Sequence, residues 1–343
     1  MRRGRSTPVR DERSRPSWIV VVSQRVAFDA CRKGRTDLCG AASTRPGGER
    51  AVRSHTLALV EPVSLADVLI RLGHSPDPDD AFMFWALAAE RIDTRGFEFE
   101  HVLRDIQTLN EWAVDGKLET TAISLHTYPY VQDRYAVLPH GASMGSGYGP
   151  VLVSREPLTR DMLEGSEIAV PGKMTTAFLV LRLYFGADFA YREVPFDQIL
   201  DEVKSGRANA GLLIHEGQLT YEAEGLQKAV DLGEWWLLET GLPLPLGINV
   251  ARRDLGPVVL HDLSEVLRES ILAGLENRTE AMEYALGFGR GLDTELADRF
   301  VGMYVNEYTC DYGEEGRQAV EELLRRGEEL GAFPKPVELD FVS

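Results

Sequence analysis

Three polar segments of this chain directly follow apolar runs that have the length of buried strands. They are HSPDPDD with Asp77, Asp79 and Asp80, PGKMTTAF with Thr175 and Thr176, and the end of GLLIHE with His215. Imidazole and carboxylate groups can exchange protons with a substrate near neutral pH. The N–H groups at the start of a helix can hold an anion. The pattern therefore predicts acid–base chemistry, with an anion-binding position at the second segment.

Each of these residues also has a purely structural interpretation. The Asp residues of the first segment precede a helical pattern, and Asp is a common N-cap. The two Thr residues precede a second helical pattern and would cap it in the same way. A cap and an anion site use the same N–H groups, so both can hold at once. A lone His at the edge of a sheet, such as His215, is more often structural than catalytic. The local sequence leaves these alternatives open.

Other catalytic chemistries lack their motifs in this sequence. Six His residues lie beyond residue 67, but there is no HExxH and no His pair at i, i+4, so we expect no metal site. No GxSxG, dinucleotide fingerprint or phosphate loop is present, and Cys310 has no matching His motif. By elimination we expect an enzyme of this sequence to work without a cofactor, with His215 as the base. Tyr221 could supply a hydroxyl, and Asp231 or Glu216 could orient the imidazole.

The elements around these segments alternate between strand and helix. The pattern predicts strands at 68–73, 120–125, 167–172 and 210–216, and helices at 81–92 and 175–186, with a mostly helical tail from about residue 255. Alternation of this kind predicts a parallel α/β fold. Ligands of such sheets bind at the carboxyl ends of the strands. The three polar segments all lie at predicted strand ends.

Composition limits the classes of partner. The 343 residues suit two lobes, and 54 Asp+Glu against 37 Lys+Arg give a formal net charge of -17. This balance argues against a nucleic-acid partner and against docking on anionic membranes. No run reaches the ~18 apolar residues of a membrane span. Three Cys without a CxxC pair favour neither a disulfide scaffold nor a Cys-rich metal site.

The first 60 residues differ in charge from the rest of the chain. They hold 13 Lys+Arg and 5 Asp+Glu and show no helical or strand period. We expect residues 1–66 to be a disordered extension. Their longest apolar run has about five residues, short of the roughly 7–15 of a secretory signal, so we expect a cytoplasmic protein.

Several segments together resemble a known family. They include RLGHSPDPDDAFMFWAL, IAVPGKMTTAF, GLLIHEGQLTY and VDLGEWWLLETGLPLPLG. From about Val68 to the C-terminus the chain resembles the 1,4-dihydroxy-6-naphthoate synthases of the futalosine route to menaquinone. The resemblance implies an α/β, two-lobed fold like the type-II periplasmic binding proteins, with a central cleft. The first lobe would comprise residues 67–157 and 247–343, and the second residues 158–246.

The resemblance also implies a reaction and its residues. Cyclic dehypoxanthine futalosine would be split into 1,4-dihydroxy-6-naphthoate and dihydroxyacetone, with no cofactor and no metal. The family's proton acceptor falls on His215, and its substrate-binding positions fall on Ala122, Ile123, Ser124, Thr176 and Ala177. The family often has Lys where this chain has Ala122, so backbone contacts or Ser124 are expected to serve there. The partner would be a small-molecule carboxylate.

Two other functions remain open at this point. One is the chorismate dehydratase of the same pathway, which shares the fold. The other is a non-catalytic solute-binding or sensor protein. The HSPDPDD and IHEGQLTY segments favour the synthase.

Overall fold

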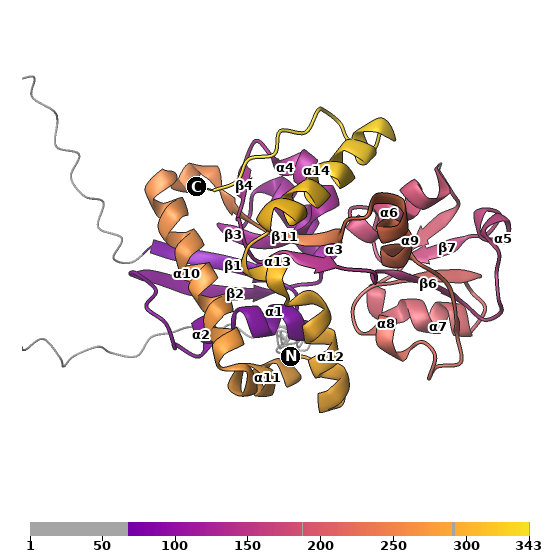
Figure 1. Ribbon diagram of the computed structural model, residues 1–343, viewed down its shortest axis with the longest axis horizontal. Coiled ribbons are helices and arrows are strands. Elements are labelled where there is room, and N and C mark those ends of the chain that lie inside the picture. The colour runs from indigo at the N-terminus through magenta and orange to yellow at the C-terminus, as the bar shows by residue number, and fades with distance from the viewer. Residues whose placement is uncertain (1–67, 187, 290–291, 343) are drawn as a thin grey trace, which may run out of the picture.

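The computed structural model describes residues 68–186, 188–289 and 292–342. The extension predicted over residues 1–66 lies outside the described residues. The described chain forms two sheets, each flanked by helices, which lie at opposite ends of the elongated molecule (Figure 1). We call each sheet with its helices a lobe.

The first sheet has six strands. In spatial order they are β2 (Phe97–Leu103), β1 (Val68–His74), β3 (Thr120–Ser124), β11 (Leu244–Arg252) and β4 (Tyr135–Val137), with β5 (Ser143–Gly145) paired to the start of β11. Strands β2, β1 and β3 run parallel, whereas β11 is antiparallel to β3, β4 and β5. The prediction of a parallel sheet is therefore wrong for β11, because this strand returns from the second lobe and enters the sheet in the opposite direction.

Helices of the first lobe cover both faces of its sheet. They are α1 (Pro78–Met83), α2 (Trp85–Ala88), α3 (Ile106–Asp115), α4 (Tyr128–Val131), α10 (Pro257–Glu276), α11 (Arg278–Leu286), α12 (Thr294–Tyr304), α13 (Glu307–Cys310) and α14 (Gly313–Glu329). Ile70 and Leu72 of β1 pack with α1, α10 and α11 in one core, while Leu109 of α3 packs over the other face. The mostly helical tail was predicted correctly, and its first two helices, α10 and α11, meet at Asn277.

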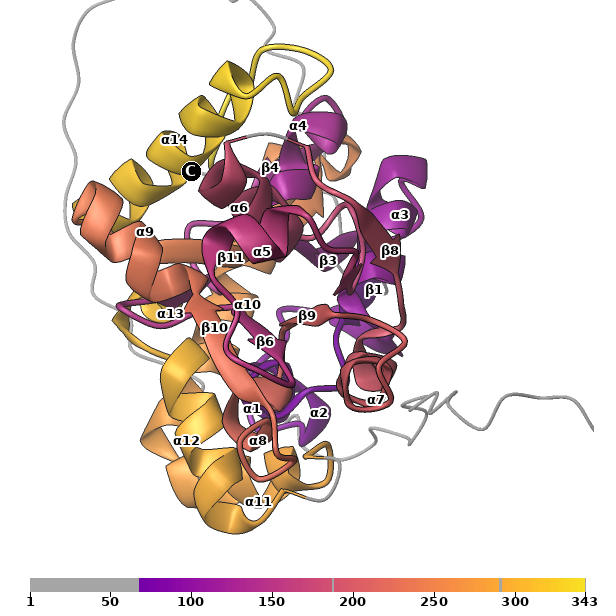
Figure 2. The same ribbon diagram turned by 90° about the vertical axis from the view of Figure 1, so that its right-hand side faces the viewer.

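The second sheet has five strands. Their order is β10 (Gln227–Asp231), β6 (Val151–Ser154), β9 (Ala210–Leu213), β7 (Ile168–Val170) and β8 (Tyr191–Glu193). The helices of this lobe are α5 (Arg160–Glu164), α6 (Thr176–Phe185), α7 (Ile199–Lys204), α8 (Gly217–Thr220) and α9 (Leu232–Thr240). Helices α6 and α9 lie over one face and α7 and α8 over the other (Figures 1 and 2). Strand β6, which the sequence analysis assigned to the first lobe, pairs with β9 and β10, so the chain enters the second lobe before residue 158.

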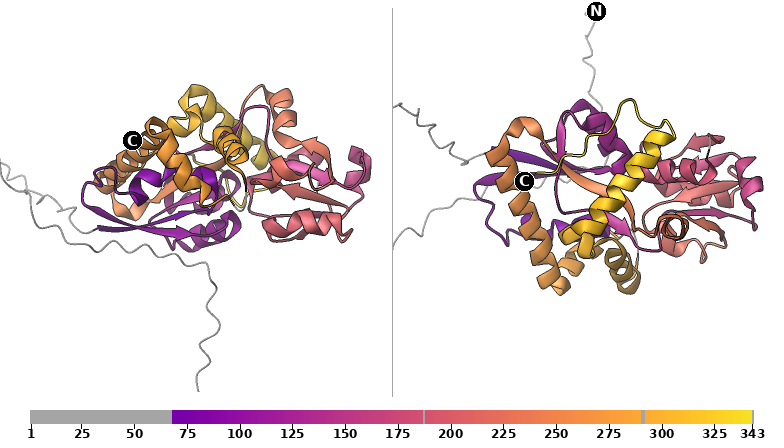
Figure 3. Two further views of the ribbon diagram at one scale, coloured as in Figure 1. Left: turned by 90° about the horizontal axis from the view of Figure 1, so that it is seen from below. Right: turned by 45° about the horizontal axis from the view of Figure 1, so that its top comes forward.

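The two lobes share part of one hydrophobic core. Ile123 and Val137 of the first sheet belong to the same buried cluster as Leu179 and Trp236 of the second lobe. Helix α14 lies across the junction, where its Leu323 joins this cluster (Figure 3). This shared core holds the strand ends of both sheets close to the junction.

A close backbone approach at the junction makes Gly233 a strong test of the fold. A Cβ added to Gly233 would lie 2.0 Å from the Tyr148 carbonyl oxygen, which is backbone and cannot move aside. We expect Gly233→Ala to lower the free energy of unfolding by about 3 kcal/mol, the upper end of the usual cost of overpacking. Urea denaturation measures this change. Gly165→Ala is the matched control, since its nearest atom would be 3.8 Å away, and an equal loss in both variants would contradict the prediction.

Three buried histidines and the half-buried His101 predict loss of stability in weak acid. Burial lowers the pKa of His74 from 6.5 to about 3, and the pKa values of His101, His126 and His140 to about 4. Below pH 6.5 the unfolded chain binds protons at these positions and the folded chain does not, so stability falls as the pH falls from 6.5 toward 4. Asp79 and Asp80, whose pKa values burial raises, oppose this trend.

The expected net loss is on the order of 1–3 kcal/mol per pH unit, because a full proton difference contributes about 1.4 kcal/mol per unit and the four histidines outweigh the three carboxyl groups, Asp79, Asp80 and Asp231, whose pKa values burial raises. Chemical denaturation at pH 6.5, 5.5 and 4.5 measures it. His140→Gln removes the imidazole next to Ser264. This variant should lose less free energy of unfolding per pH unit, by about the 1.4 kcal/mol that one group contributes. Stability that is unchanged between pH 6.5 and 4.5 would contradict this account.

Candidate active site

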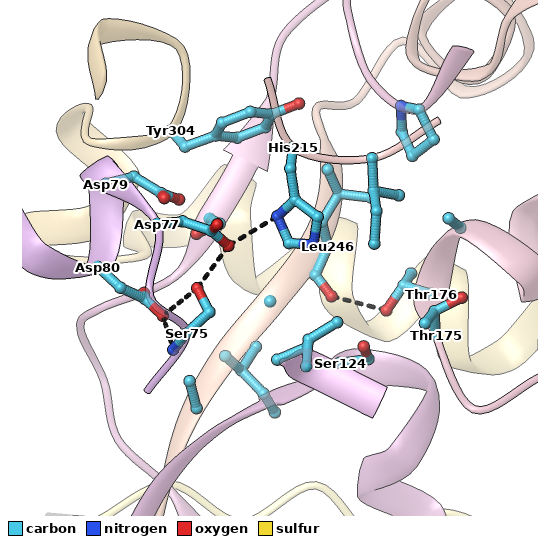
Figure 4. Close-up of a pocket in the computed structure, with 18 of the residues that line it drawn as sticks. Ser75, Asp77, Asp79, Asp80, Ser124, Thr175, Thr176, His215, Leu246 and Tyr304 are labelled. Atoms are coloured by element: carbon cyan, nitrogen blue, oxygen red, sulfur yellow. Dashed lines mark hydrogen bonds and ion pairs between the residues drawn. The ribbon is translucent and has the colours of Figure 1, made fainter. Parts of the chain in front are cut away.

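A pocket lies where the strand ends of the two lobes meet. The space within it, including the part open to solvent, is about 730 Å³, and its walls come mainly from the β1–α1 loop and the first turn of α1, the end of β3, the start of α6, the end of β9, strand β11 and helix α12. All three polar segments predicted from the sequence contribute to it. Figure 4 shows the carboxylates on one side, Thr175 and Thr176 on the other, and His215 between them.

Asp77 occupies the N-cap position of α1, but its side chain does not cap the helix. Its backbone is extended, with φ -112° and ψ 155°, and Pro78 begins the helix. No hydrogen bond runs from the first turn of α1 to the Asp77 carboxylate. Instead Asp77 Oδ2 lies 2.7 Å from Nδ1 of His215 and 2.7 Å from Oγ of Ser75. The structural interpretation of Asp77 is therefore wrong, and its side chain belongs to the pocket.

Ser75 connects Asp77 to a second carboxyl group. Asp80 Oδ2 accepts a hydrogen bond from the Ser75 N–H at 2.7 Å and lies 2.9 Å from Ser75 Oγ. One hydroxyl has one proton, so Ser75 can donate to only one carboxylate at a time. Burial raises the pKa of Asp80 to about 6, and it raises the pKa of Asp79 well above its usual range. This side of the pocket can thus retain a carboxyl proton near neutral pH.

His215 follows β9 in an unusual backbone conformation. Its φ is +62°, a left-handed value that is uncommon for residues other than glycine and is concentrated at functional sites. The Gln218 N–H donates to the His215 carbonyl at 3.1 Å, and the Phe196 ring packs against the imidazole at 4.5 Å between centroids. The side chain is 12% exposed and faces the pocket. These contacts present the imidazole to a ligand.

The start of α6 forms the opposite wall. Thr175 is the N-cap, because its Oγ1 accepts from the Phe178 N–H at 3.2 Å. The Thr176 hydroxyl donates to the Leu246 carbonyl at 2.6 Å and accepts from the His126 N–H at 3.2 Å. Both hydroxyls are therefore committed to the protein. The N–H groups of Thr176 and Ala177 have no carbonyl within the helix to which they could donate, and both residues line the pocket.

The structure separates the three predicted residues of β3. Ala122 and Ser124 line the pocket. Ser124 Oγ accepts from the Asn110 amide at 3.0 Å, which fixes the hydroxyl. Ile123 lies between them in the strand and is fully buried in the shared core. Successive side chains of a strand point to opposite faces, so the side chain of Ile123 is not at the pocket.

Two residues expected to assist His215, Asp231 and Tyr221, do not line the pocket. Asp231 accepts from the Gly233 and Glu234 N–H groups and caps α9. The Tyr221 hydroxyl donates to Glu222, and the ring packs in the second lobe's own core. Although both residues are near His215 in the sequence, their side chains contact other groups. The expectations that Tyr221 supplies a hydroxyl and that Asp231 orients the imidazole are therefore wrong.

The sequence analysis missed Gln218 and Tyr304. The Tyr304 hydroxyl lies 2.8 Å from the Gln218 side chain, so α12 of the first lobe is joined to α8 of the second beside the pocket. Burial raises the pKa of Tyr304, so its hydroxyl stays protonated. Gln218 stands three residues after His215 and could have been suspected, whereas nothing in the sequence connects Tyr304 to this site.

The pocket combines the His215 imidazole, carboxyl groups whose pKa values burial raises, and the N–H groups at the start of α6. Groups of at least three His, Cys, Asp or Glu side chains arranged to hold a metal ion do not occur among the described residues. Within the same part of the chain, no helix is long and apolar enough to cross a membrane. The arrangement can bind an anionic molecule at α6 and remove a proton from it at His215.

Comparisons with known proteins indicate the family to which this chain belongs. The model of a family described as menaquinone biosynthesis matches residues 70–329. The 1,4-dihydroxy-6-naphthoate synthase of Thermus thermophilus is 44% identical over 268 residues, which cover 78% of this chain and 97% of that protein. A crystal structure of an Archaeoglobus fulgidus protein is 47% identical, with a TM-score of 0.74, and covers 77% of this chain and 98% of that one.

A more distant structure supports the fold alone. A Candida albicans protein described as having the generic periplasmic binding protein fold matches with a TM-score of 0.62 at 10% identity, covering 80% of this chain and 98% of that one. The expected two-lobed, periplasmic-binding-protein-like fold is thereby confirmed. With a family model that spans most of its described residues and a relative matched over nearly its whole length, this chain belongs to the menaquinone biosynthesis family.

Proposed function

We propose that this protein is a 1,4-dihydroxy-6-naphthoate synthase, a carbon–carbon lyase that splits cyclic dehypoxanthine futalosine into 1,4-dihydroxy-6-naphthoate and dihydroxyacetone. The observation that carries the proposal is the position of His215, between the carboxyl groups at the N-terminus of α1 and the start of α6. The name of the Thermus thermophilus relative, matched over 97% of its length, supports the choice of reaction.

In the proposed reaction His215 acts as the general base. It takes a proton from a carbon or hydroxyl beside a carbonyl, and the released electron pair breaks the carbon–carbon bond to the three-carbon fragment. The two products together contain all the atoms of the substrate, so no oxidant, reductant or water is consumed. Formation of the aromatic ring drives the step. A positioned base contributes about 10²–10⁴-fold to such a rate.

The two ends of the pocket suit the two ends of this substrate. Its carboxylate would accept hydrogen bonds from the Thr176 and Ala177 N–H groups, which the helix dipole of α6 reinforces. Ser124 would contact the ring system from β3, with backbone contacts at Ala122. The hydroxyl-rich end would face Asp79 and Asp80, because carboxyl groups accept hydrogen bonds from hydroxyls.

A direct assay separates this function from the alternatives. Purified protein is given cyclic dehypoxanthine futalosine, and dihydroxynaphthoate and dihydroxyacetone are measured by mass spectrometry. A parallel reaction with chorismate tests the dehydratase. We expect stoichiometric release of both products from the first substrate and none from chorismate. Tight binding of the cyclic compound without turnover would instead support a solute-binding or sensor protein.

The proposal also includes the cellular location of the protein and its binding partners. We infer that the protein works in the cytoplasm on a small-molecule carboxylate, without nucleic acid, membrane or cofactor. The formal net charge of -17 supports the absence of nucleic-acid and anionic-membrane partners. Activity that persists after exhaustive dialysis against a chelator is the expected result for the cofactor-free reaction.

A further inference from the structure

The contact between Asp77 and His215 crosses the pocket from one lobe to the other. Asp77 lies in the loop between β1 and α1 of the first lobe, and His215 follows β9 of the second. Their Oδ2 and Nδ1 atoms are 2.7 Å apart, a normal length for a charge-assisted hydrogen bond. The side chains are 2% and 12% exposed, so little water competes for this contact.

The Asp77 carboxylate is held in place independently of His215. Its backbone is fixed by Pro78, which begins α1, and the Ala81 N–H donates to the Asp77 carbonyl at 3.0 Å. Ser75 Oγ holds the carboxylate oxygen at 2.7 Å. The Asp77 side chain caps no N–H group of the first turn of α1, so the carboxylate contacts His215 and Ser75 at the expense of a helix cap.

We propose that Asp77 is the positioning residue for His215. The carboxylate accepts a hydrogen bond from Nδ1–H, which fixes the tautomer in which Nε2 is the proton acceptor, and it stabilises the imidazolium that forms when Nε2 takes the proton. Because the two residues come from different lobes, Asp77 can orient the His215 ring only when the lobes are closed. This proposal deepens the function proposed above and rests on it for its kinetic consequences.

Other acidic residues near His215 are placed less well for this role. Asp80 Oδ2 accepts a hydrogen bond from the Ser75 N–H, which directs this carboxyl group toward Ser75. Asp79 and Asp80 act on His215 through their charge, without a hydrogen bond to the ring. Asp231 caps α9. Asp77 alone among these four carboxylates is shown within hydrogen-bond distance of the described His215 ring.

The kinetic test replaces Asp77 with its uncharged isostere. Asp77→Asn should lower kcat by about 10²–10⁴-fold, the range for loss of a correctly oriented base, and leave KM within about three-fold. Asp77→Glu, which restores a carboxylate, should recover part of the lost kcat. Asp293→Asn is the matched control, because Asp293 caps α12 away from the pocket and Asn caps equally well. A kcat for Asp77→Asn within three-fold of the unmodified protein would overturn the proposal.

A second measurement does not depend on the substrate. Nitrogen-15 NMR of histidine-labelled protein, with the His215 signals assigned by their loss in His215→Asn, reports which ring nitrogen carries the proton. We expect an Nδ1–H tautomer that is lost or mixed in Asp77→Asn. An Nε2–H tautomer in the unmodified protein, or a tautomer unaffected by Asp77→Asn, would overturn the proposal. If the synthase assay fails while the tautomer depends on Asp77, the proposed function is wrong and the positioning contact stands.

Discussion

His215→Asn should fold, bind ligand and lose about 10²–10⁴-fold in kcat, the usual contribution of a general base. Asparagine resembles imidazole in size and can donate or accept a hydrogen bond, so it can keep a contact with Asp77. It cannot take a proton near neutral pH. Because the effect lies in proton transfer, KM should change little, and steady-state kinetics with the cyclic substrate measures the separation.

Exposed His261 provides the matched control for this substitution. It lies in α10, outside the pocket, so His261→Asn should keep kcat and KM within about two-fold. Unchanged circular dichroism and thermal melting of His215→Asn would exclude a folding defect. If His215→Asn retains more than about a tenth of the kcat, the assignment of the base is wrong. The next candidates would be Asp79 and Asp80, since Tyr221 lies outside the pocket.

The sequence could predict which segments form the pocket because the rule behind that prediction is local. An apolar strand, the polar loop after it and the start of the next helix occur within about ten residues. Parallel strands place their carboxyl ends along one edge of the sheet. His215, Asp77 with the two aspartates of the first turn of α1, and the start of α6 were all found in this way. The resemblance to a known family then favoured a catalytic His215 over a structural one.

The partner of His215 could not be predicted from chain spacing. Asp77 and His215 are far apart in sequence and belong to different lobes, so their contact depends on how the lobes pack. Asp231 and Glu216 are nearer along the chain, yet Asp231 caps a helix. Tyr304 was missed for the same reason, because α12 reaches the pocket only through packing of the first lobe against α8.

The order and direction of strands were also beyond local patterns. Strand β11 pairs with β3, β4 and β5 after the chain has passed through the whole second lobe. Its apolar residues are compatible with a parallel or an antiparallel neighbour. Only the return path from α9 sets its direction, and this path is a property of the assembled fold.

Thr176 shows how a correct position can have an unexpected role. The sequence placed it at the substrate, and it does line the pocket. Its hydroxyl, however, joins α6 to β11 through the Leu246 carbonyl, so the groups left to hold a carboxylate are the N–H groups of Thr176 and Ala177. A side-chain substitution cannot remove a backbone N–H group. A negatively charged side chain beside that group can, however, repel the carboxylate that it would bind.

Ala177→Asp should therefore raise KM for the cyclic substrate by about 10²–10³-fold, since placing like charges together costs several kcal/mol. Ala177 is the second residue of α6, is 3% exposed and lines the pocket. An acidic residue in the first turn interacts favourably with the helix dipole, which offsets part of the cost of placing a carboxylate at this buried position. The effect should fall on binding, with kcat reduced much less, because His215 is unchanged.

Ala177→Asn separates charge from size in this test. It adds a side chain of the same shape without the negative charge, so it should raise KM by less than about ten-fold, the scale of losing one or two ordinary contacts. Raising the ionic strength should reduce the difference in KM between Ala177→Asp and Ala177→Asn only slightly, because charges in a buried pocket are poorly screened. Equal KM values for Ala177→Asp and Ala177→Asn would mean that the substrate carboxylate binds elsewhere, and the orientation of the substrate between α6 and the β1–α1 loop would have to be reversed.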